Sequence, residues 1–470
     1  MNPAEWAAHD PDPVTRAEVL GWIAADDPRL SSRFAGPLTF GTAGLRGPIG
    51  AGESAMNVAT VTRATAGLAA WLGVGARVVL GCDARHGSAA FYEAAAEVFS
   101  AAGVEVLALP PRQPTPLTAF AVRHFHADAG VMITASHNPA TDNGYKVFDA
   151  SGSQIIPPSD AEIAAAIDAA GWADEIPRSR GNIREVDVVE DYLARAVSLI
   201  DAPSSQPVIV TTALHGVGAA VLARALREAG FANVHPVAEQ QDPDPDFPTV
   251  AYPNPEEAGA LDLAFALAAE VDADLILALD PDADRCAVAV AGRPFTGDEI
   301  GAILGWDIAS RTGEGVLACS HVSSRLLGKI AADQGLGFVE TDTGFKWIAR
   351  VPDLVFGYEE ALGYCVDPRY VADKDGITAC LRVAEVASRS DLAALLDDLG
   401  DRFGHHLTRQ VAVRVAQPAG ERVVREFGAD RVIVRPSGTE PKVKYYYETV
   451  APTRQEAQRR LERLMKDHHP

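Results

Sequence analysis

Short apolar runs alternate with helical patterns along most of this chain, and that alternation constrains the fold more than any other feature. Apolar runs at 78–80 and 104–109 flank a helical pattern at 88–102, and Gly103 follows the end of that pattern. Two strands joined through a helix pair in parallel, because the helix carries the chain back over the sheet. The spacing therefore predicts α/β units with largely parallel sheets.

The same rhythm recurs, which predicts several domains. A second unit begins near Val186 and a third near Phe295, whereas the last 70 or so residues read as strands followed by a closing helix. At roughly 100–150 residues each, a chain of this length has three or four domains. We expect three α/β domains and a C-terminal α+β domain, with bounds at 1–185, 186–295, 296–400 and 401–470.

Charge and cysteine content disfavour several classes of protein. The chain carries 41 basic and 64 acidic side chains, a net charge of −23, so nucleic acid and anionic membranes are poor partners. No apolar run approaches the ~20 residues of a membrane span. The five cysteines include no C-x-x-C pair, which favours a reduced, cytoplasmic protein over a disulfide framework or a zinc site. We expect a monomer or a weak dimer.

One apolar run, 129–133, leads into a loop that can carry chemistry. The loop reads TASHNP over 134–139, with Ser136 beside His137. In α/β folds, reacting groups lie on the loops beyond the carboxyl ends of strands. A serine next to a histidine can supply a nucleophile and a proton carrier. The plainer alternative is a turn serine and a solvated histidine.

Two basic residues stand close to glycine-containing turns. Arg46 lies among three glycines, whose backbone amides can face an anion, although a plain turn is an alternative. Lys146 follows the turn dipeptide Asn143-Gly144 and can either return toward the serine loop or remain a solvated hairpin lysine.

A second apolar run, 275–279, ends in three aspartates. Asp280, Asp282 and Asp284 are spaced by two, so in an extended chain their carboxylates point the same way. Two such charges ~4 Å apart repel by ~4 kcal/mol at an effective dielectric constant of ~20, so the set calls for a cation. Oxygen ligands favour Mg²⁺. A solvated acidic loop is the alternative, and an EF-hand is excluded because the required glycine and final glutamate are missing.

Two further stretches suit a phosphosugar. Arg435-Pro436-Ser437-Gly438-Thr439 combines a guanidinium fork, two hydroxyls and a glycine amide, which together can grip a phosphate; a surface turn is the alternative. Glu359 and Glu360 lie in a glycine-bounded loop and can accept hydrogen bonds from sugar hydroxyls, or form a solvated acidic pair. The segment 215–218 (HGVG) lacks the third glycine of a dinucleotide fingerprint, because Val221 stands there.

Five stretches in fixed order resemble the α-D-phosphohexomutases, the family of phosphoglucomutase and phosphomannomutase. They are FGTAGLRG from Phe40, TASHNP from Thr134, DPDADR from Asp280, GYEEALGY from Gly357 and RPSGTEPK from Arg435. The resemblance implies three related mixed-sheet α/β domains and a C-terminal phosphate-binding domain around one central cleft.

The resemblance also implies roles for individual residues. Ser136 would carry the transferred phosphate, with Mg²⁺ held by Asp280, Asp282, Asp284 and a phosphoserine oxygen. The residues flanking that phosphate would be Arg46, His137 and Lys146, of which Lys146 is the general base or acid. Substrate would be bound by Arg285, Lys346, Glu359, Glu360, Arg435, Ser437, Gly438 and Thr439. The implied reaction interconverts a sugar 1-phosphate and a 6-phosphate through a sugar bisphosphate, with glucose expected first and mannose next.

Two alternatives remain open from the sequence. Many family members have a serine and a histidine where this chain has Leu362 and Tyr364, and the motif form is closer to the phosphoglucomutase-2 branch, which includes phosphopentomutases. The sugar can therefore be a pentose. A strand ending in Asp280-Pro281-Asp282 also resembles the nucleophile motif of a Mg²⁺-dependent phosphohydrolase. That alternative leaves the TASHNP and RPSGTEP stretches unexplained.

Overall fold

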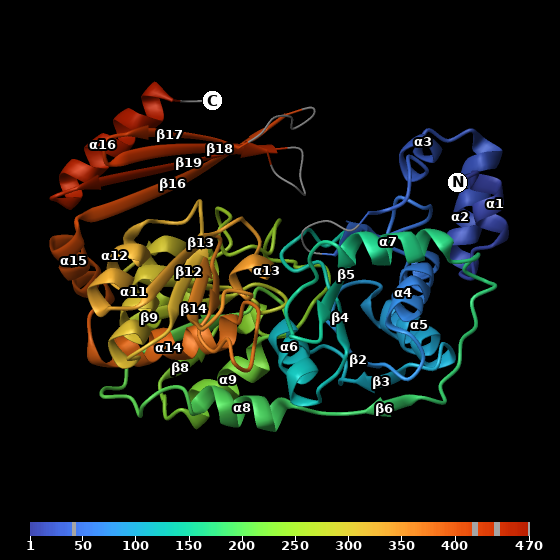
Figure 1. Ribbon diagram of the computed structural model, residues 1–470, viewed down its shortest axis with the longest axis horizontal. Coiled ribbons are helices and arrows are strands. Elements are labelled where there is room, and N and C mark those ends of the chain that lie inside the picture. Colours follow the sequence, from blue (N-terminus) through green and yellow to red (C-terminus); the bar gives the residue numbers. More distant parts are fainter. Residues whose placement is uncertain (40–43, 416–421, 437–441, 469–470) are drawn as a thin grey trace.

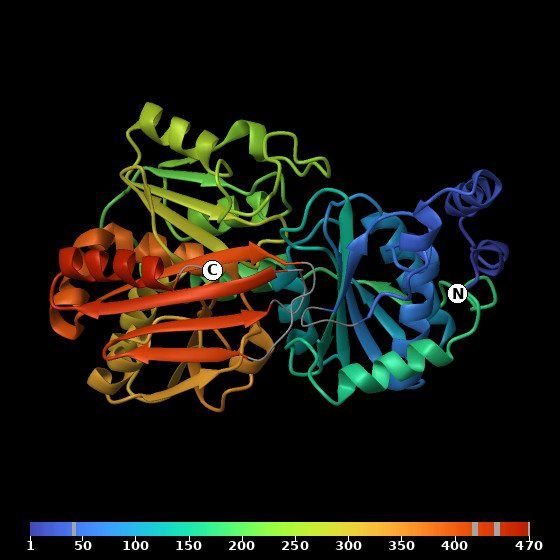
Figure 2. The ribbon, with the colours of Figure 1, turned by 90° about the horizontal axis from the view of Figure 1, so that it is seen from above.

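The computed structural model describes residues 1–39, 44–415, 422–436 and 442–468, and these residues form four sheets (Figure 1). Helices pack against each of the first three sheets, and a single helix lies on one face of the fourth. Seen from above, the fourth sheet lies over the third, and the first sheet lies at the opposite end of the molecule (Figure 2). The predicted series of three α/β units and a C-terminal α+β unit is confirmed. No helix among the described residues combines the length and apolarity needed to cross a bilayer.

The first sheet is mixed and has the order β1-β5-β4-β2-β3-β6. Its strands are β1 (Leu45–Pro48), β2 (Arg77–Cys82), β3 (Glu105–Ala108), β4 (Ala129–Ile133), β5 (Asp142–Asp149) and β6 (Ile183–Glu185). Its helices are α1 (Pro3–Ala8), α2 (Pro13–Ala25), α3 (Arg29–Arg33), α4 (Val58–Leu72), α5 (Ser88–Ala101), α6 (Thr115–His124) and α7 (Ser159–Ala169). Strand β4 pairs in parallel with β2 but antiparallel with β5. The expectation of largely parallel pairing therefore holds for β4, β2, β3 and β6, and fails for β1 and β5.

The second sheet has the order β11-β10-β9-β7-β8 and the third β13-β12-β14-β15. The second unit contains α8 (Val189–Val197), β7 (Ile209–Thr212), α9 (Ala219–Glu228), β8 (Val234–Pro236), the short 3₁₀ helix η1 (Ala238–Gln240), α10 (Asp262–Val271), β9 (Leu275–Leu279), β10 (Cys286–Val290) and β11 (Arg293–Pro294). The third contains α11 (Gly297–Arg311), β12 (Val316–Ser320), α12 (Leu326–Gln334), β13 (Gly337–Thr341), α13 (Phe345–Ile348), β14 (Leu354–Glu359), β15 (Gly363–Cys365), α14 (Gly376–Arg389) and α15 (Leu392–Phe403).

The fourth sheet is fully antiparallel, with the order β16-β19-β18-β17. Its elements are β16 (His405–Arg414), β17 (Val423–Phe427), β18 (Asp430–Pro436), β19 (Lys442–Ala451) and the closing helix α16 (Arg454–Asp467). The apolar runs at 411–415, 432–434 and 443–447 predict β16, β18 and β19, whereas β17 is missed. All five residues of this edge strand are exposed, so it has no buried face to produce a strong periodic signal.

The hydrophobic core explains why the first three units act as one scaffold. A single cluster of buried side chains includes Val79 of β2, Leu277 of β9 and Leu317 of β12, one from each of the first three sheets. The fourth unit has its own core beneath α16. It touches the third unit through a smaller cluster around Tyr446. Loops that leave the first three sheets are therefore held in fixed positions where the units meet.

One turn prediction is wrong. Asn143 and Gly144 lie inside β5 and do not form a hairpin turn. The Asn143 side chain is buried and donates to His86 O at 2.8 Å and to Ser88 Oγ at 3.0 Å. A Cβ on Gly144 would stand 2.5 Å from Thr134 O. The glycine therefore allows β5 to approach the serine loop, which overrides the local turn preference of the dipeptide.

Candidate active site

Ser136 lies on the loop directly beyond the buried strand β4. Its backbone adopts φ +54°, in the left-handed region, and its amide donates to Thr134 Oγ1 at 2.9 Å. The Ser136 hydroxyl donates to Asp280 Oδ2 at 2.9 Å and lies 3.2 Å from His137 Nδ1. The two motifs predicted to act together, one after β4 and one after β9, thus meet at a hydrogen bond.

Arg85 holds the backbone of the serine loop in place, a role that the sequence does not predict. Its buried guanidinium donates to four backbone carbonyls: Ser136 O at 2.6 Å, Asn138 O at 2.5 Å, Pro139 O at 2.7 Å and Asp142 O at 3.2 Å. Arg85 therefore fixes the backbone from Ser136 to Asp142, directly after the reactive hydroxyl. The segment Asp83-Ala84-Arg85 after β2 is its only sequence signal, a charged pair directly beyond an apolar strand.

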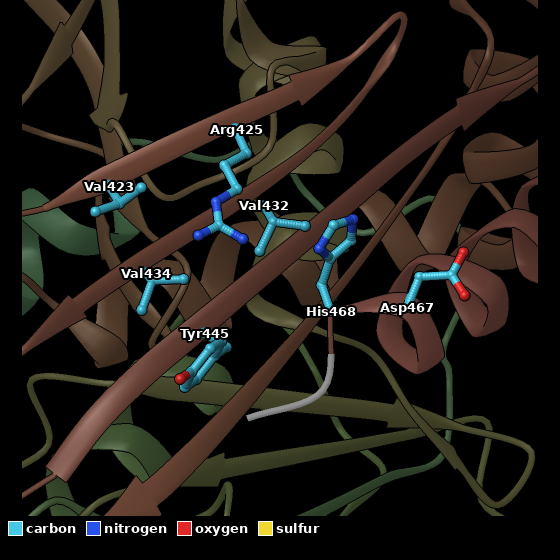
Figure 3. A pocket seen from close by; sticks show the side chains of 7 residues that line it. All are labelled: Val423, Arg425, Val432, Val434, Tyr445, Asp467 and His468. Carbon is cyan, nitrogen blue, oxygen red and sulfur yellow. The ribbon is translucent and has the colours of Figure 1, made fainter.

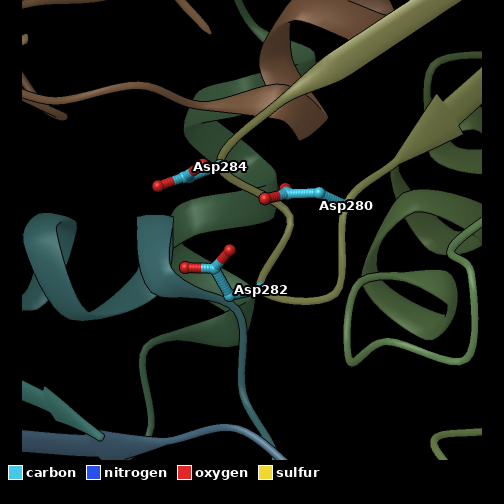
Figure 4. Close-up of side chains that lie close together, drawn as sticks. All are labelled: Asp280, Asp282 and Asp284. Atoms are coloured by element: carbon cyan, nitrogen blue, oxygen red, sulfur yellow. The ribbon is translucent and has the colours of Figure 1, made fainter. Parts of the chain in front are cut away.

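The three aspartates converge on one point (Figure 4). Their carboxylates are fully buried, and one oxygen of each lies within 4.8 Å of the others. The aspartates converge because the chain turns between β9 and β10, where Ala283 has φ +59°. The expectation that an extended chain aligns them is therefore wrong in its geometry, although the predicted cluster forms.

Two lysines from different units approach the aspartates. Lys146 Nζ, from β5, donates to Asp282 Oδ2 at 2.7 Å and to Asp284 Oδ2 at 2.9 Å. Lys374 Nζ donates to Asp284 Oδ2 at 2.7 Å. Lys146 is a predicted site residue, whereas Lys374 is missed. Its signal in the sequence is a lysine between two aspartates directly before the glycine that begins α14.

These contacts set the protonation states of the cluster. Burial, with the neighbouring Asp282 and Asp284, raises the pKa of Asp280 well above its ordinary value. Burial also acts against ionisation of Asp284, but Lys146 and Lys374 outweigh it and hold its pKa well below the ordinary value. Burial lowers the pKa of Lys146, and the two carboxylates more than reverse this, so its pKa is raised and it is an ammonium group at neutral pH.

The residues of this cluster fit a divalent cation. Asp282 Oδ1 and Asp284 Oδ1 are buried and accept no hydrogen bond within the described part of the protein. Buried carboxylate oxygens without a partner carry a large desolvation cost, which a bound cation would offset. The all-oxygen donor set suits Mg²⁺. Of the described residues, these three aspartates form the only acidic, histidine or cysteine cluster close enough to share an ion.

Two of the predicted residues, Arg46 and His137, lie near the aspartates and interact with Asp284. Arg46, on β1, donates to Asn138 Oδ1 at 3.4 Å, and its Nε is buried without a hydrogen-bond partner among the described residues. Burial, together with Arg285 and Arg46, lowers the pKa of His137 well below its ordinary value, so the imidazole is neutral. Lys346, on α13, lies 5.7 Å from the ring centroid of Trp347, and burial lowers its pKa.

Serine hydroxyls hold Glu360, and a backbone amide holds Glu359. Glu360 Oε2 accepts from Ser320 Oγ at 2.9 Å and from Ser323 Oγ at 3.3 Å. Glu359 Oε1 accepts from the Gly344 amide at 2.8 Å. Burial, with Glu360 beside it, raises the pKa of Glu359.

The two unusual residues of this loop do not face a cleft. Leu362 and Tyr364 are both buried. The Tyr364 hydroxyl donates to Gly297 O at 3.3 Å, and its ring stacks near that of Tyr358 with centroids 6.4 Å apart.

The fourth sheet presents a basic row toward the third unit. Arg435 pairs with Lys444, and Ile433 with Tyr446, across β18 and β19, and Tyr446 packs on Val322 of the third unit. Side chains alternate across a strand, so Arg435 and Lys444 share that face. The predicted phosphate-binding residues Ser437, Gly438 and Thr439 lie outside the described residues, as does part of the Arg46 loop, 40–43.

The opposite face of this sheet carries a separate hollow of about 300 Å³ (Figure 3). It is lined by Val423, Arg425, Val432, Val434, Tyr445, Asp467 and His468. Val432 and Val434 point away from the face that Ile433 and Arg435 occupy, so this hollow is not part of the site.

The HGVG segment supports the aspartate loop. Val217 N donates to Pro281 O at 2.8 Å, and a Cβ on Gly216 would lie 2.3 Å from Pro281 Cα. Only glycine permits that approach, so the packing gives a physical reason for the glycine that involves no nucleotide.

Comparison with known proteins covers nearly the whole chain. Segments 37–174, 190–293 and 296–403 match the models described as phosphoglucomutase/phosphomannomutase α/β/α domains I, II and III, and 379–466 matches the C-terminal domain of the same family.

Three similar proteins illustrate the relationship. A probable phosphomannomutase of Haemophilus influenzae is 41% identical over 83% of this chain and 92% of its own length. A phosphopentomutase of Mus musculus is 37% identical over 86% of this chain and 74% of its own length. The crystal structure of a putative phosphomannomutase from Thermus thermophilus aligns with a TM-score of 0.76 at 28% identity, covering 92% of this chain and all (100%) of that one.

Proposed function

The chain belongs to the phosphoglucomutase/phosphomannomutase family of phosphosugar mutases. We propose that it interconverts a sugar 1-phosphate and the same sugar phosphorylated at its far end. A phosphorylated Ser136 would carry the group, and a sugar bisphosphate would be the intermediate. The observation that carries this proposal is the 2.9 Å hydrogen bond from Ser136 Oγ to Asp280 at the edge of the buried aspartate cluster.

The proposed residue roles follow from their surroundings. Asp280, Asp282 and Asp284 would hold Mg²⁺ with a phosphoserine oxygen, and Arg46, His137 and Lys146 would flank the transferred phosphate. Bound there, Mg²⁺ would supply positive charge that stabilises the phosphoryl oxygens. Substrate would be held by Arg285, Lys346, Glu359 and Glu360, with Arg435, Ser437, Gly438 and Thr439 at the phosphate that is not reacting.

Lys146 can balance the proton transfers by itself. As the Ser136 Oγ–P bond breaks and a bond from the sugar oxygen to phosphorus forms, the ammonium would give one proton to Ser136 Oγ. The resulting amine would take the proton of the sugar hydroxyl, so Lys146 ends in its starting state. Its raised pKa, which the flanking carboxylates cause, favours the ammonium as the resting form.

Return of the other phosphate requires the bisphosphate to turn around in the cleft. The same phosphoserine site would then serve both ends of the sugar, while the basic row of the fourth sheet binds whichever phosphate is distant. Four domains with bounds at 1–185, 186–295, 296–400 and 401–470 would enclose this cleft.

A cytoplasmic location is also proposed, supported by five free and buried cysteines.

Hexose phosphates, glucose and then mannose, are the first candidates, and pentose phosphates are the second. Two observations support the pentose alternative. The chain is similar to a phosphopentomutase, and it has Leu362 and Tyr364 where many family members have a serine and a histidine. Turnover of glucose, mannose, glucosamine and ribose 1-phosphates separates these candidates.

The Ser136→Ala variant tests the mechanism. It should lose all turnover while still binding the substrate, and the wild-type protein should incorporate acid-stable label from a bisphosphate at Ser136. An acid-labile acyl phosphate on Asp280 would instead identify a phosphohydrolase, and full activity of Ser136→Ala would refute the proposed role.

A further inference from the structure

The loop before α10 places one glutamate at the meeting point of the last three units. Pro253 and Pro255 of this loop are buried, and Asn254 Oδ1 accepts from the Glu256 amide at 3.1 Å. The turn is therefore anchored on both sides of Asn254. The Glu256 side chain that follows is 37% exposed.

Glu256 is one of two acidic side chains that lie within 4 Å of the Arg285 guanidinium among the described residues. Arg285 Nη1 lies 3.6 Å from Glu256 Oε2, and Arg285 Nε lies 3.8 Å from Asp284 Oδ1. The Arg285 side chain is only 15% exposed, and its Nε has no hydrogen-bond partner among the described residues. The guanidinium thus lies between a partly exposed carboxylate and the fully buried aspartate cluster.

Charges from the third and fourth units also act on Glu256. Glu360 of the third unit and Lys444 of the fourth are both close enough to influence its carboxyl group. Glu256 is therefore close to the predicted sugar-binding glutamate and to the basic row of the fourth sheet. None of these neighbours hydrogen-bonds to the Glu256 carboxylate within the described residues, so it remains available to hold Arg285.

We propose that Glu256 is a positioning residue for the phosphosugar, acting through Arg285. This inference rests on the proposed function, in which Arg285 binds substrate. A guanidinium beside Asp284 is attracted toward the buried cluster, where it would be withdrawn from the substrate and would compete for the metal-binding carboxylates. Glu256 attracts the same guanidinium from the opposite side and holds its donors where a phosphosugar can reach them.

The Glu256→Gln variant removes the charge and keeps the shape of the side chain. We expect KM for the preferred sugar phosphate to rise about tenfold while kcat changes less than about threefold, because the loss affects binding more than the chemical step. Glu257→Gln is the matched control: it is the adjacent, exposed glutamate, has no ion pair among the described residues, and should leave both constants unchanged.

A double-mutant cycle identifies the route of the effect. In an Arg285→Ala background, Glu256→Gln should have no further effect, because the group that it positions is gone. An unchanged KM in Glu256→Gln, or an equal effect with and without Arg285, would overturn the inference.

Binding of glucose 1-phosphate and ribose 1-phosphate to Ser136→Ala proteins, measured by calorimetry, gives a readout without turnover. A weakening of about tenfold on adding Glu256→Gln is expected. If the wild-type protein turns over no sugar phosphate, the proposed function fails. If adding Glu256→Gln leaves binding unchanged, the role of Glu256 is refuted and the proposed function still stands.

Discussion

Lys374 Nζ lies 2.7 Å from Asp284 Oδ2 and reaches this carboxylate from the third unit, whereas Asp284 belongs to the second. Lys146 of the first unit donates to the same oxygen at 2.9 Å. One carboxylate oxygen thus joins three units of the fold. It also places an ammonium group in competition with any cation that Asp284 binds.

Replacing Lys374 by alanine should strengthen Mg²⁺ binding and slow turnover. The carboxylate loses a competing positive charge, so we expect the Mg²⁺ affinity to rise about tenfold. The transferring phosphoryl group also loses a nearby cation, so kcat should fall by about 100-fold. Calorimetric titration with Mg²⁺ and steady-state assays measure the two effects. Lys466→Ala, at the exposed end of α16, is the control; weaker Mg²⁺ binding in Lys374→Ala would contradict the competition argument.

Chelation of divalent cations should abolish turnover and lower the melting temperature. Asp282 Oδ1 and Asp284 Oδ1 have no hydrogen-bond partner among the described residues, so a bound cation stabilises the folded state. At a free concentration 100 times its Kd, a ligand of the native state contributes about 2.7 kcal/mol. Scanning calorimetry with and without Mg²⁺ measures this shift.

The Asp282→Asn variant should lose most of the Mg²⁺-dependent stabilisation, because the amide supplies one fewer charge to the ion. Asp262→Asn, at the exposed start of α10, should retain it. An identical Mg²⁺ shift in Asp282→Asn would show that the ion binds elsewhere.

Arg85→Lys should impair catalysis although Arg85 touches no predicted substrate group. A lysine ammonium cannot replace a planar guanidinium that donates to four carbonyls. We expect kcat to fall by about 10–100-fold because small displacements of a nucleophile are costly, and stability to fall by about 2–4 kcal/mol. Denaturant unfolding and kinetics measure these effects, with exposed Arg184→Lys as the control. Wild-type kcat in a folded Arg85→Lys protein would refute the role in loop positioning.

The sequence predicts where the reacting groups lie better than it predicts how they are held. Ser136 and Asp280 each follow a continuous apolar strand, so their positions at strand ends can be inferred from local pattern. Arg85 and Lys374 act on groups about 50 and 90 residues away in the chain, and no local pattern encodes such pairings. Supporting residues of this kind are identified only once the units are packed together.

Local preference also fails where packing is tight. The Asn143-Gly144 pair favours a turn in isolation, yet the close approach of β5 to Thr134 places it within a strand. The three aspartates meet through the left-handed backbone at Ala283, a conformation that alanine rarely adopts and that no sequence rule would predict. In both cases tertiary contacts around the site decide the backbone.

Asp298 provides a prediction about pH that is independent of the metal site. It is buried at the start of α11, and its Oδ1 accepts from the Ser324 amide at 2.6 Å and from the Tyr358 hydroxyl at 2.9 Å. Burial raises its pKa from 3.8 to about 7. Between these two values the folded state binds more protons than the unfolded state, so this group makes the protein less stable as pH rises.

The Asp298→Asn variant should flatten that dependence. The amide oxygen of the asparagine can still accept both hydrogen bonds, but the side chain does not titrate. The stability of the variant relative to wild type should therefore rise between pH 4 and pH 7 and stay constant above pH 7. The gain is at most about 4 kcal/mol for a pKa shift of this size. Denaturant unfolding at a series of pH values measures it, with exposed Asp398→Asn as the control. A constant difference between Asp298→Asn and wild type across this range would show that Asp298 does not titrate on unfolding.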